Sequence, residues 1–259
     1  MFKEIKNILL GKIKTIYYNF KTKRVFYTIY FNYKYLPYSQ AKKLPILFYK
    51  SAYATISNGG KIILSDEAVM AGKKIHIGQH TLDFEYQCEK THLYIYAGTV
   101  QFKGGFSMRR GCIFDIRGDV KFGDKVRFAP RCRLRIHNSM CCGSDVAFSH
   151  ETQVFDSNFH YMEPELSPGF YPISKKIVIG SCCWISNRTT VMPGTILPDY
   201  IVVASNSLIN KDYSFLRPNS LIGGVPAKLI KEGYARVWDT DRELQYHLKE
   251  FKWRNDISK

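Results

Sequence analysis

Long apolar runs are absent from this sequence of 259 residues, and no uninterrupted stretch approaches the ~20 residues that a membrane-spanning helix needs. The N-terminus lacks the succession of basic, apolar and small residues that is typical of a signal peptide, so we expect a cytoplasmic protein. None of the seven cysteines lies in a C-x-x-C pair. Zinc sites usually use separated cysteine pairs, so we expect reduced cysteines and no metal.

Acidic residues are scarce, with 22 Asp and Glu against 38 Lys and Arg. Much of the basic excess falls in residues 1–50, which hold ten lysines and Arg24 against Glu4 alone. In residues 1–20, apolar side chains recur at helical spacing with lysines between them, which predicts a basic amphipathic helix. Residues 25–33 are rich in β-branched and aromatic residues and could form a strand. We treat residues 1–58 as one N-terminal segment, which either packs on the main domain or lies on an anionic membrane surface at the inner face of the membrane.

The main domain carries a repeat of six residues. Aliphatic or aromatic residues stand six apart in three runs: Ile116, Phe122, Phe128 and Leu134; then Cys142, Phe148 and Val154; then Ile179, Ile185, Val191, Leu197, Val203 and Ile209. Neither a helix, with a period near 3.6, nor a simple strand, with a period of 2, produces this spacing. A coil of three short flat faces does, so the sequence predicts a triangular parallel β-helix over residues 59–215, with irregular early coils.

The repeat stops after Val154 and resumes at Ile179, and a solenoid must eject such an insertion as a loop, here about residues 155–176. His160 is the one histidine in this loop, and carboxylates lie nearby in the sequence. Histidine takes and returns a proton at neutral pH, so His160 is the candidate general base. Asp156 is the first candidate to orient it, with Glu151 or Glu163 as alternatives, and Asn158 and Glu163 could contact an acceptor. Residues 216–259 form a C-terminal tail, which ends in an amphipathic helix predicted to cap the last coil.

Four motifs occur in a fixed order near the C-terminus: Ile179-Gly-Ser-Cys-Cys-Trp-Ile-Ser-Asn187, Val191-Met-Pro-Gly-Thr-Ile196, Lys211-Asp212 and Gly223-Gly-Val-Pro-Ala-Lys-Leu-Ile-Lys231. They resemble the signature of hexapeptide-repeat O-acetyltransferases of the maltose and galactoside acetyltransferase type. The similarity is greatest to the branch that modifies bacterial capsule and lipopolysaccharide sugars.

The resemblance implies a left-handed parallel β-helix, a homotrimer, acetyl-CoA in the groove between subunits, and a loop histidine, here His160, that activates the acceptor hydroxyl. The positions that it implies for contact with acetyl-CoA are Trp184, Asn187, Ser205, Asn210, Lys211, Lys228 and Lys231.

We therefore expect an acetyl-CoA-dependent O-acetyltransferase that acts on a sugar hydroxyl of a bacterial surface polysaccharide or its precursor. Since no cysteine or serine has the setting of an activated nucleophile, direct transfer is favoured over an acyl-enzyme. A nucleotide-sugar N-acyltransferase is the enzymatic alternative, although the G-x-G-x-x-G turn that often accompanies one is missing. The non-enzymatic alternative is a basic protein that binds nucleic acid or a membrane surface. Nucleic acid is not an expected partner, because no recognition motif accompanies the charge.

Overall fold

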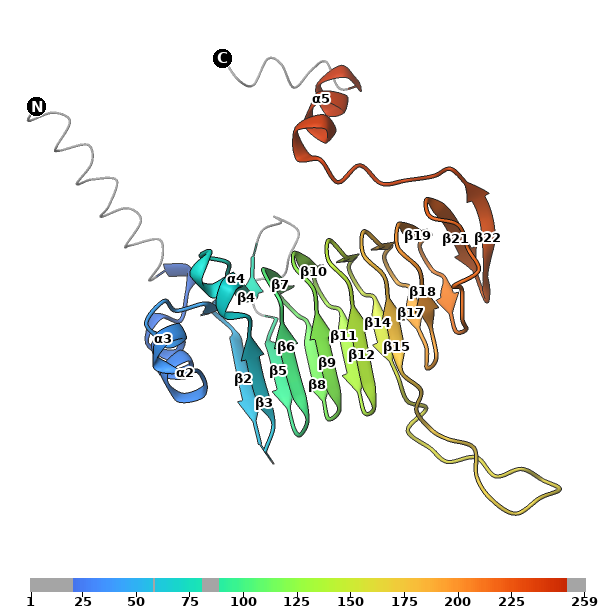
Figure 1. Ribbon diagram of the computed structural model, residues 1–259, viewed down its shortest axis with the longest axis horizontal. Coiled ribbons are helices and arrows are strands. Elements are labelled where there is room, and N and C mark those ends of the chain that lie inside the picture. The colour runs from blue at the N-terminus through green and yellow to red at the C-terminus, as the bar shows by residue number, and fades with distance from the viewer. Residues whose placement is uncertain (1–20, 58, 81–88, 251–259) are drawn as a thin grey trace, which may run out of the picture.

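The computed structural model describes residues 21–57, 59–80 and 89–250. Its strands form three sheets, parallel except for the last pair of strands in one of them. The chain winds through the three sheets in turn as a left-handed β-helix (Figure 1), which confirms the predicted fold. Each coil contributes one strand to each sheet in turn. The predicted amphipathic helix of residues 1–20 lies outside the described residues.

The sheets differ in their number of strands. The nine-stranded sheet contains β1 (Ile46–Phe48), β4 (Ile75–Gln79), β7 (Phe106–Arg109), β10 (Val126–Phe128), β13 (Ala147–Phe148), β16 (Trp184–Ile185), β19 (Ile201–Val203), β21 (Ser220–Gly224) and β22 (Ala227–Glu232). The seven-stranded sheet contains β2 (Ala52–Ile56), β5 (Thr91–Ile95), β8 (Ile113–Ile116), β11 (Arg133–Ile136), β14 (Gln153–Phe155), β17 (Thr190–Val191) and β20 (Leu208–Ile209). The six-stranded sheet contains β3 (Lys61–Leu64), β6 (Thr99–Phe102), β9 (Asp119–Phe122), β12 (Ser139–Cys142), β15 (Ile177–Ile179) and β18 (Ile196–Leu197).

The core of the β-helix consists of the residues that define the repeat. Every member of the three six-residue runs is buried, and so are the small residues Cys183, Thr189, Thr195 and Ser207 that lie between them at the corners. The phenylalanines stack from coil to coil, with the rings of Phe128 and Phe148 parallel at 4.1 Å between centroids. Parallel register places like residues above one another, so one aliphatic or aromatic ladder fills the interior behind each sheet.

The N-terminal end of the β-helix is covered by a helix, and the strand predicted for residues 25–33 is wrong. Residues Val25–Tyr35 form α2, which buries Thr28, Phe31 and Asn32 on one face. Asn32 Nδ2 donates to Ile46 O at 2.7 Å, and the backbone N–H groups of Ile46 and Phe48 donate to Asn32 Oδ1 and Thr28 Oγ1. The helix thus supplies side-chain hydrogen-bond partners to the backbone groups of β1, whose edge would otherwise be open. A short helix, α3 (Tyr38–Ala41), follows it.

The first coil begins earlier than residue 59, where the sequence suggested it. β1 pairs with β4 and β2 pairs with β5, so both strands already belong to the β-helix. The early coils are irregular, as expected: α4 (Asp66–Met70) is inserted at a corner, and the register of β4 with β7 shifts after Ile77.

The C-terminal helix forms but does not cap the last coil, which corrects the prediction. The antiparallel hairpin of β21 and β22 lies at that end of the stack, together with the buried side chains of Tyr213 and Leu216. The helix α5 (Thr240–Glu250) buries none of its residues and lies away from the coils (Figure 1). Its connection crosses the nine-stranded sheet, where Arg236 stacks over Trp184 at 5.1 Å.

Candidate functional site

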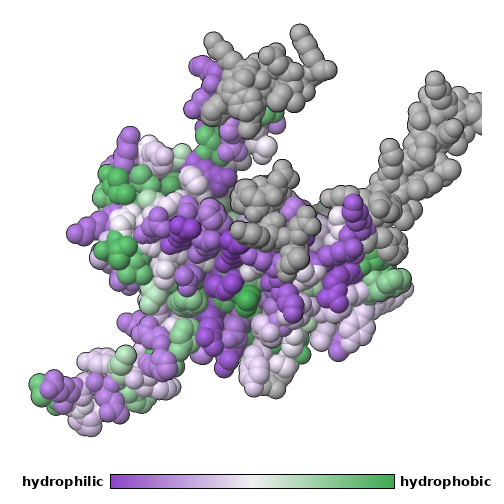
Figure 2. Space-filling model, turned by 180° about the vertical axis from the view of Figure 1, so that it is seen from behind, coloured by the Kyte–Doolittle hydropathy of each residue, from purple (hydrophilic) through white to green (hydrophobic). Residues whose placement is uncertain are grey.

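The ejected loop is the largest departure from the regular coils. It leaves after β14 and returns at β15, at the corner between the seven-stranded and six-stranded sheets. Its two sides pair with each other through antiparallel bridges between Ser157 and Ser174 and between Met162 and Tyr171. The loop therefore extends from the body as an arm (Figures 1 and 2). We refer to residues 156–176 as the arm.

Asp156 anchors the base of the arm. Its side chain is fully buried, and its two carboxylate oxygens accept hydrogen bonds from the backbone N–H groups of His137 and Asn138, both at 2.7 Å. Burial raises the pKa of this carboxyl group above its ordinary value, while the backbone donors oppose the shift. Both oxygens are engaged with the preceding coil, so the geometry supports a positioning role for Asp156 rather than direct orientation of the His160 ring.

His160 is exposed on the outgoing side of the arm. The residue before it, Phe159, packs onto the body, with its ring 4.5 Å from the guanidinium of Arg135 and 5.2 Å from the ring of His137. These contacts fix the position at which His160 leaves the surface. Asn158 and Glu163 are exposed on the same arm, and the Asn158 N–H donates to Ile173 O at 2.8 Å.

His137 is a neighbour of the site that the sequence did not indicate. It lies at the corner after β11, and its Nε2 is buried without a hydrogen-bond partner. Burial lowers the pKa of its imidazole, and the nearby Arg117 adds to the effect. The repeat places this histidine among the regular coils, and no sequence signal marks its contact with Phe159 of the arm.

A second group of expected site residues lies at a different corner, between the nine-stranded and seven-stranded sheets. The Trp184 indole N–H donates to Ser149 Oγ at 2.9 Å, and Ser205 Oγ donates to Asn187 Oδ1 at 2.6 Å from the next coil. Lys228 pairs in register with Gly223, which in turn lies against Ala204 at this corner. We call Trp184, Asn187, Ser205 and Lys228 the tryptophan corner.

The remaining expected cofactor contacts are not at the tryptophan corner. Asn210 and Lys211 follow β20 at the same edge as the arm, and the Lys211 ammonium lies 5.4 Å from the ring centroid of Tyr213. Lys231 is farther along β22, opposite Leu221. Within one chain Lys211 therefore lies at a different corner from Lys228 and Lys231, which both belong to β22.

Glu151, one of the alternatives for assisting His160, is engaged elsewhere. It pairs with Arg188 at 2.7 Å and with Arg131 at 3.4 Å, near the tryptophan corner. The hydrogen bond from Arg188 lowers the pKa of the Glu151 carboxyl group. Glu151 therefore belongs to a row of ion pairs along this corner, and Glu163 remains the alternative that lies on the arm itself.

Two features are absent from the described ranges, 21–57, 59–80 and 89–250. No group of three or more His, Cys, Asp or Glu side chains there could hold a metal ion. No helix among the same residues is long and apolar enough to cross a membrane.

Comparison with known proteins gives several related acetyltransferases, although no family model matches the chain. The chain is 30% identical over 145 residues to the putative lipopolysaccharide biosynthesis O-acetyl transferase WbbJ of Escherichia coli K12, a match that covers 52% of this chain and 72% of that protein. It is 37% identical over 101 residues to a chloramphenicol acetyltransferase of Klebsiella aerogenes, covering 38% of this chain and 44% of that one. Among solved structures, the polySia-specific acetyltransferase NeuO aligns with a TM-score of 0.44 and 18% identity over 76% of this chain and 81% of that chain.

Proposed function

This chain belongs to the hexapeptide-repeat acetyltransferase family and is an acyltransferase, and from that premise we propose that it transfers an acetyl group from acetyl-CoA to a sugar hydroxyl. The acceptor is a bacterial surface polysaccharide or its precursor. The observation that carries this proposal is the 30% identity to a putative lipopolysaccharide O-acetyl transferase, 72% of which the chain spans. A cytoplasmic reaction near the inner face of the membrane agrees with the basic N-terminal segment.

His160 is the general base of this reaction. A sugar hydroxyl holds its proton tightly, and an imidazole can take that proton as the oxygen attacks the thioester carbonyl and later pass it on to the departing CoA sulfur. The exposed position of His160 on the arm leaves room for a large acceptor. Asn158 and Glu163, on the same arm, are placed to contact acceptor hydroxyls.

Asp156 supports His160 as a positioning residue. Its buried carboxylate holds the base of the arm to the backbone of the coil below, at 2.7 Å from each amide nitrogen. Hydrogen bonds between a carboxylate and backbone N–H groups are among the stronger ones in proteins. The arm therefore leaves the body in a fixed direction, which a transfer between two bound substrates requires.

Acetyl-CoA binds at the tryptophan corner and at Asn210, Lys211 and Lys231. The lysines supply countercharge to the phosphates of CoA, and Trp184 forms a wall of the site. Since the arm and the tryptophan corner lie at different edges of one chain, the complete site forms between neighbouring subunits of a homotrimer. One subunit then supplies His160 and Lys211, and the next supplies Asn187 and Ser205.

Mass spectrometry of a glycan panel incubated with isotopically labelled acetyl-CoA tests the proposed function. We expect labelled acetyl groups on a bacterial surface glycan, released by mild alkali as esters are. An alkali-stable label on an amino sugar would identify an N-acyltransferase instead. Release of free CoA without a labelled glycan, across the panel, would contradict the proposal.

A further inference from the structure

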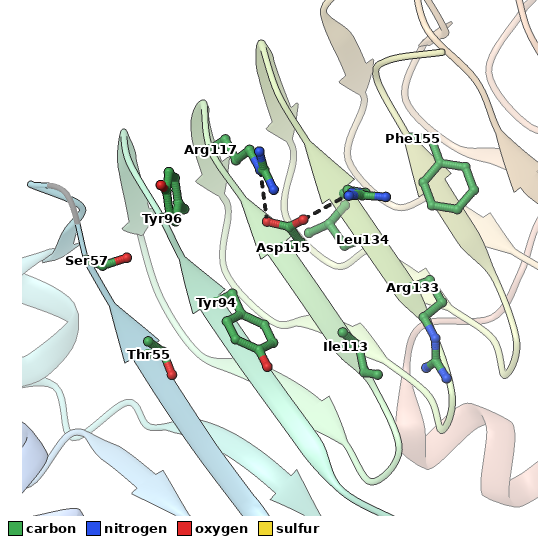
Figure 3. Close-up of a pocket in the computed structure, with 11 residues that line it drawn as sticks. Thr55, Ser57, Tyr94, Tyr96, Ile113, Asp115, Arg117, Arg133, Leu134 and Phe155 are labelled. Carbon is green, nitrogen blue, oxygen red and sulfur yellow. Dashed lines mark hydrogen bonds and ion pairs between the residues drawn. The ribbon is translucent and has the colours of Figure 1, made fainter. Parts of the chain in front are cut away.

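The outer face of the seven-stranded sheet carries a groove that the proposed transfer site does not use. It has a volume of about 490 Å³ and crosses five neighbouring strands, β2, β5, β8, β11 and β14 (Figure 3). Since adjacent strands lie ~4.8 Å apart, the groove runs for ~19 Å across the coils. We call it the sheet groove, and its side chains come from alternate, outward-facing positions of these strands.

Apolar side-chain surface forms much of the lining of the sheet groove. Tyr94, Tyr96 and Ile113 line it with 39%, 49% and 38% of their surfaces exposed. A tyrosine offers a flat apolar face together with a hydroxyl group that can hydrogen-bond. A pyranose ring presents the matching combination of an apolar C–H face and a polar edge, so tyrosines can stack on sugar rings without removing sugar hydroxyls from hydrogen bonds.

Positive charge exceeds negative charge along the sheet groove. Arg117, Arg133 and Arg135 line it together with one carboxylate, that of Asp115. Asp115 accepts from Arg135 Nε at 3.0 Å and from Arg117 Nε at 3.4 Å (Figure 3). Arg133 instead donates through Nη1 to the carbonyl oxygen of Gly111 at 2.6 Å, which leaves its charge without a carboxylate partner among the described residues. Three guanidinium groups and one carboxylate leave a surplus of about two positive charges.

The sheet groove ends at the base of the arm. Phe155 lines its last strand, and the ring of Phe155 meets that of Phe159 edge-on at 5.9 Å. Phe159 also covers the Arg135 guanidinium, and His160 is the next residue. A chain that lies across the strands would therefore run from the first coil to the place where His160 leaves the surface.

We propose that the sheet groove binds a negatively charged oligosaccharide stretch of the acceptor and directs it toward the arm. The inference rests on the proposed function, which it deepens by naming an anionic glycan as the acceptor. Stacking on Tyr94 and Tyr96 holds the sugar rings, and Arg117, Arg133 and Arg135 pair with carboxylate or phosphate groups. The same charge surplus disfavours a second copy of this chain packing face to face, because two such grooves would repel each other.

Direct titration with oligosaccharides tests this proposal without acetyl-CoA. The probes are the di-, tetra- and hexasaccharide of α-1,4-linked galacturonic acid, with neutral maltodextrins of the same lengths as matched ligands. We expect affinity for the uronic acid series to rise with length and to fall with salt, because the groove spans several sugar rings and the contacts are charged. The double variant Tyr94→Ala, Arg133→Met should weaken hexasaccharide binding at least about tenfold.

The control variant Lys121→Met, Tyr200→Ala removes one exposed cation and one exposed tyrosine from other faces. It should bind the hexasaccharide as the unchanged protein does, and both variants should keep the circular dichroism spectrum of the folded protein. Equal affinity of the groove variant, equal binding of neutral and charged probes, or no binding of the uronic acid series would overturn the proposal. A changed molar mass of the groove variant would also overturn it, because this face would then be a subunit contact. So would single-stranded RNA that displaces the hexasaccharide at a concentration below that of the sugar.

The two proposals fail separately. If the intact protein binds the charged hexasaccharide in the groove but labels no glycan, the proposed transfer is contradicted and the groove stands. If the protein labels a glycan and the groove variant binds and acetylates it with an unchanged KM, the groove assignment is wrong and the transfer stands.

Discussion

Individual buried polar residues decide how this β-helix is closed at its ends and interrupted at its side. Asn32 and Thr28 provide the partners for the edge of β1, and Asp156 provides those for the corner below the arm. Each one replaces a missing backbone partner with a side-chain atom, which keeps buried N–H groups hydrogen-bonded. The apolar repeat alone therefore does not predict how the end of the β-helix and the base of the arm are hydrogen-bonded.

His92 makes the stability of the protein depend on pH. It lies between Tyr53 and Tyr94, its Nε2 meets Thr55 Oγ1 at 2.9 Å, and burial lowers the pKa of its imidazole from 6.5 to about 4. Between these values the unfolded chain binds a proton at His92 that the folded chain does not, so its contribution to the free energy of unfolding falls as pH drops from 6.5 toward 4. We expect a loss of about 1 kcal/mol.

Urea denaturation at pH 7.5 and pH 4.5 measures this effect. His92→Leu should reduce the difference in unfolding free energy between the two pH values, because other titrating groups act alike in both proteins. His247→Leu, on the exposed helix α5, is the control and should leave the difference unchanged. An identical pH dependence of the unchanged protein and His92→Leu would show that His92 is not held neutral by the fold.

We expect the attachment of the arm to matter most for activity. Asp156→Ala leaves the N–H groups of His137 and Asn138 without their carboxylate partner, at a cost of ~1–3 kcal/mol for each buried group. We expect a lower free energy of unfolding, faster proteolytic cleavage within residues 157–176, and a lower kcat with little change in KM for acetyl-CoA. Denaturation, limited proteolysis and steady-state kinetics measure the three effects.

Asp199→Ala is the matched control for this prediction. Asp199 Oδ1 accepts from the Ser181 N–H at 2.6 Å at a corner that carries no arm. Its loss should lower stability without exposing the arm to protease or changing kcat. An arm that is cleaved at the same rate in Asp156→Ala and Asp199→Ala would contradict the anchoring role.

The sequence predicted the elements that follow from periodicity. It did not predict those whose structure or position depends on packing against the rest of the protein. The six-residue runs located the coils, because parallel stacking needs one apolar residue at the same place in each turn. The α2 helix was missed because Val, Ile, Tyr and Phe favour strands, although Thr28, Phe31, Asn32 and Tyr35 already have helical spacing. The apolar face of α5 predicted a helix correctly, but not that β21 and β22 would occupy the end of the stack instead.

At the scale of the whole molecule, the candidate site divides between two edges of the chain. His160 and Lys211 belong to the edge of the arm, whereas Trp184, Asn187 and Ser205 belong to the tryptophan corner. The sequence motifs predicted both groups, and the separation follows from the same repeat. Ser205 lies 18 residues, or one three-faced coil, after Asn187, whereas Lys211 lies one six-residue face farther on. Under the proposed function, a second chain would bring the groups together.

A homotrimer is therefore expected in solution, with a mass of three times 30.0 kDa by light scattering. Because the proposed site takes residues from two chains, mixed trimers of His160→Ala and Asn187→Ala should regain activity that neither variant has alone. Trimers of either single variant serve as controls. Full activity from a protein of 30.0 kDa at micromolar concentration, or no recovery in the mixture, would contradict a shared site.

The kinetics of His160→Ala test the central claim most directly, which is that the ejected arm carries the general base. The side chain is exposed, so its removal should leave the thermal midpoint and acetyl-CoA affinity unchanged. We expect kcat and kcat/KM to fall together by ~10²–10⁴, because the proton moves in the transition state, and the ascending limb of the pH–rate profile to disappear. His247→Ala, on the exposed helix α5, should remain active. Retention of more than about a tenth of the activity by His160→Ala would place the base elsewhere and contradict the account.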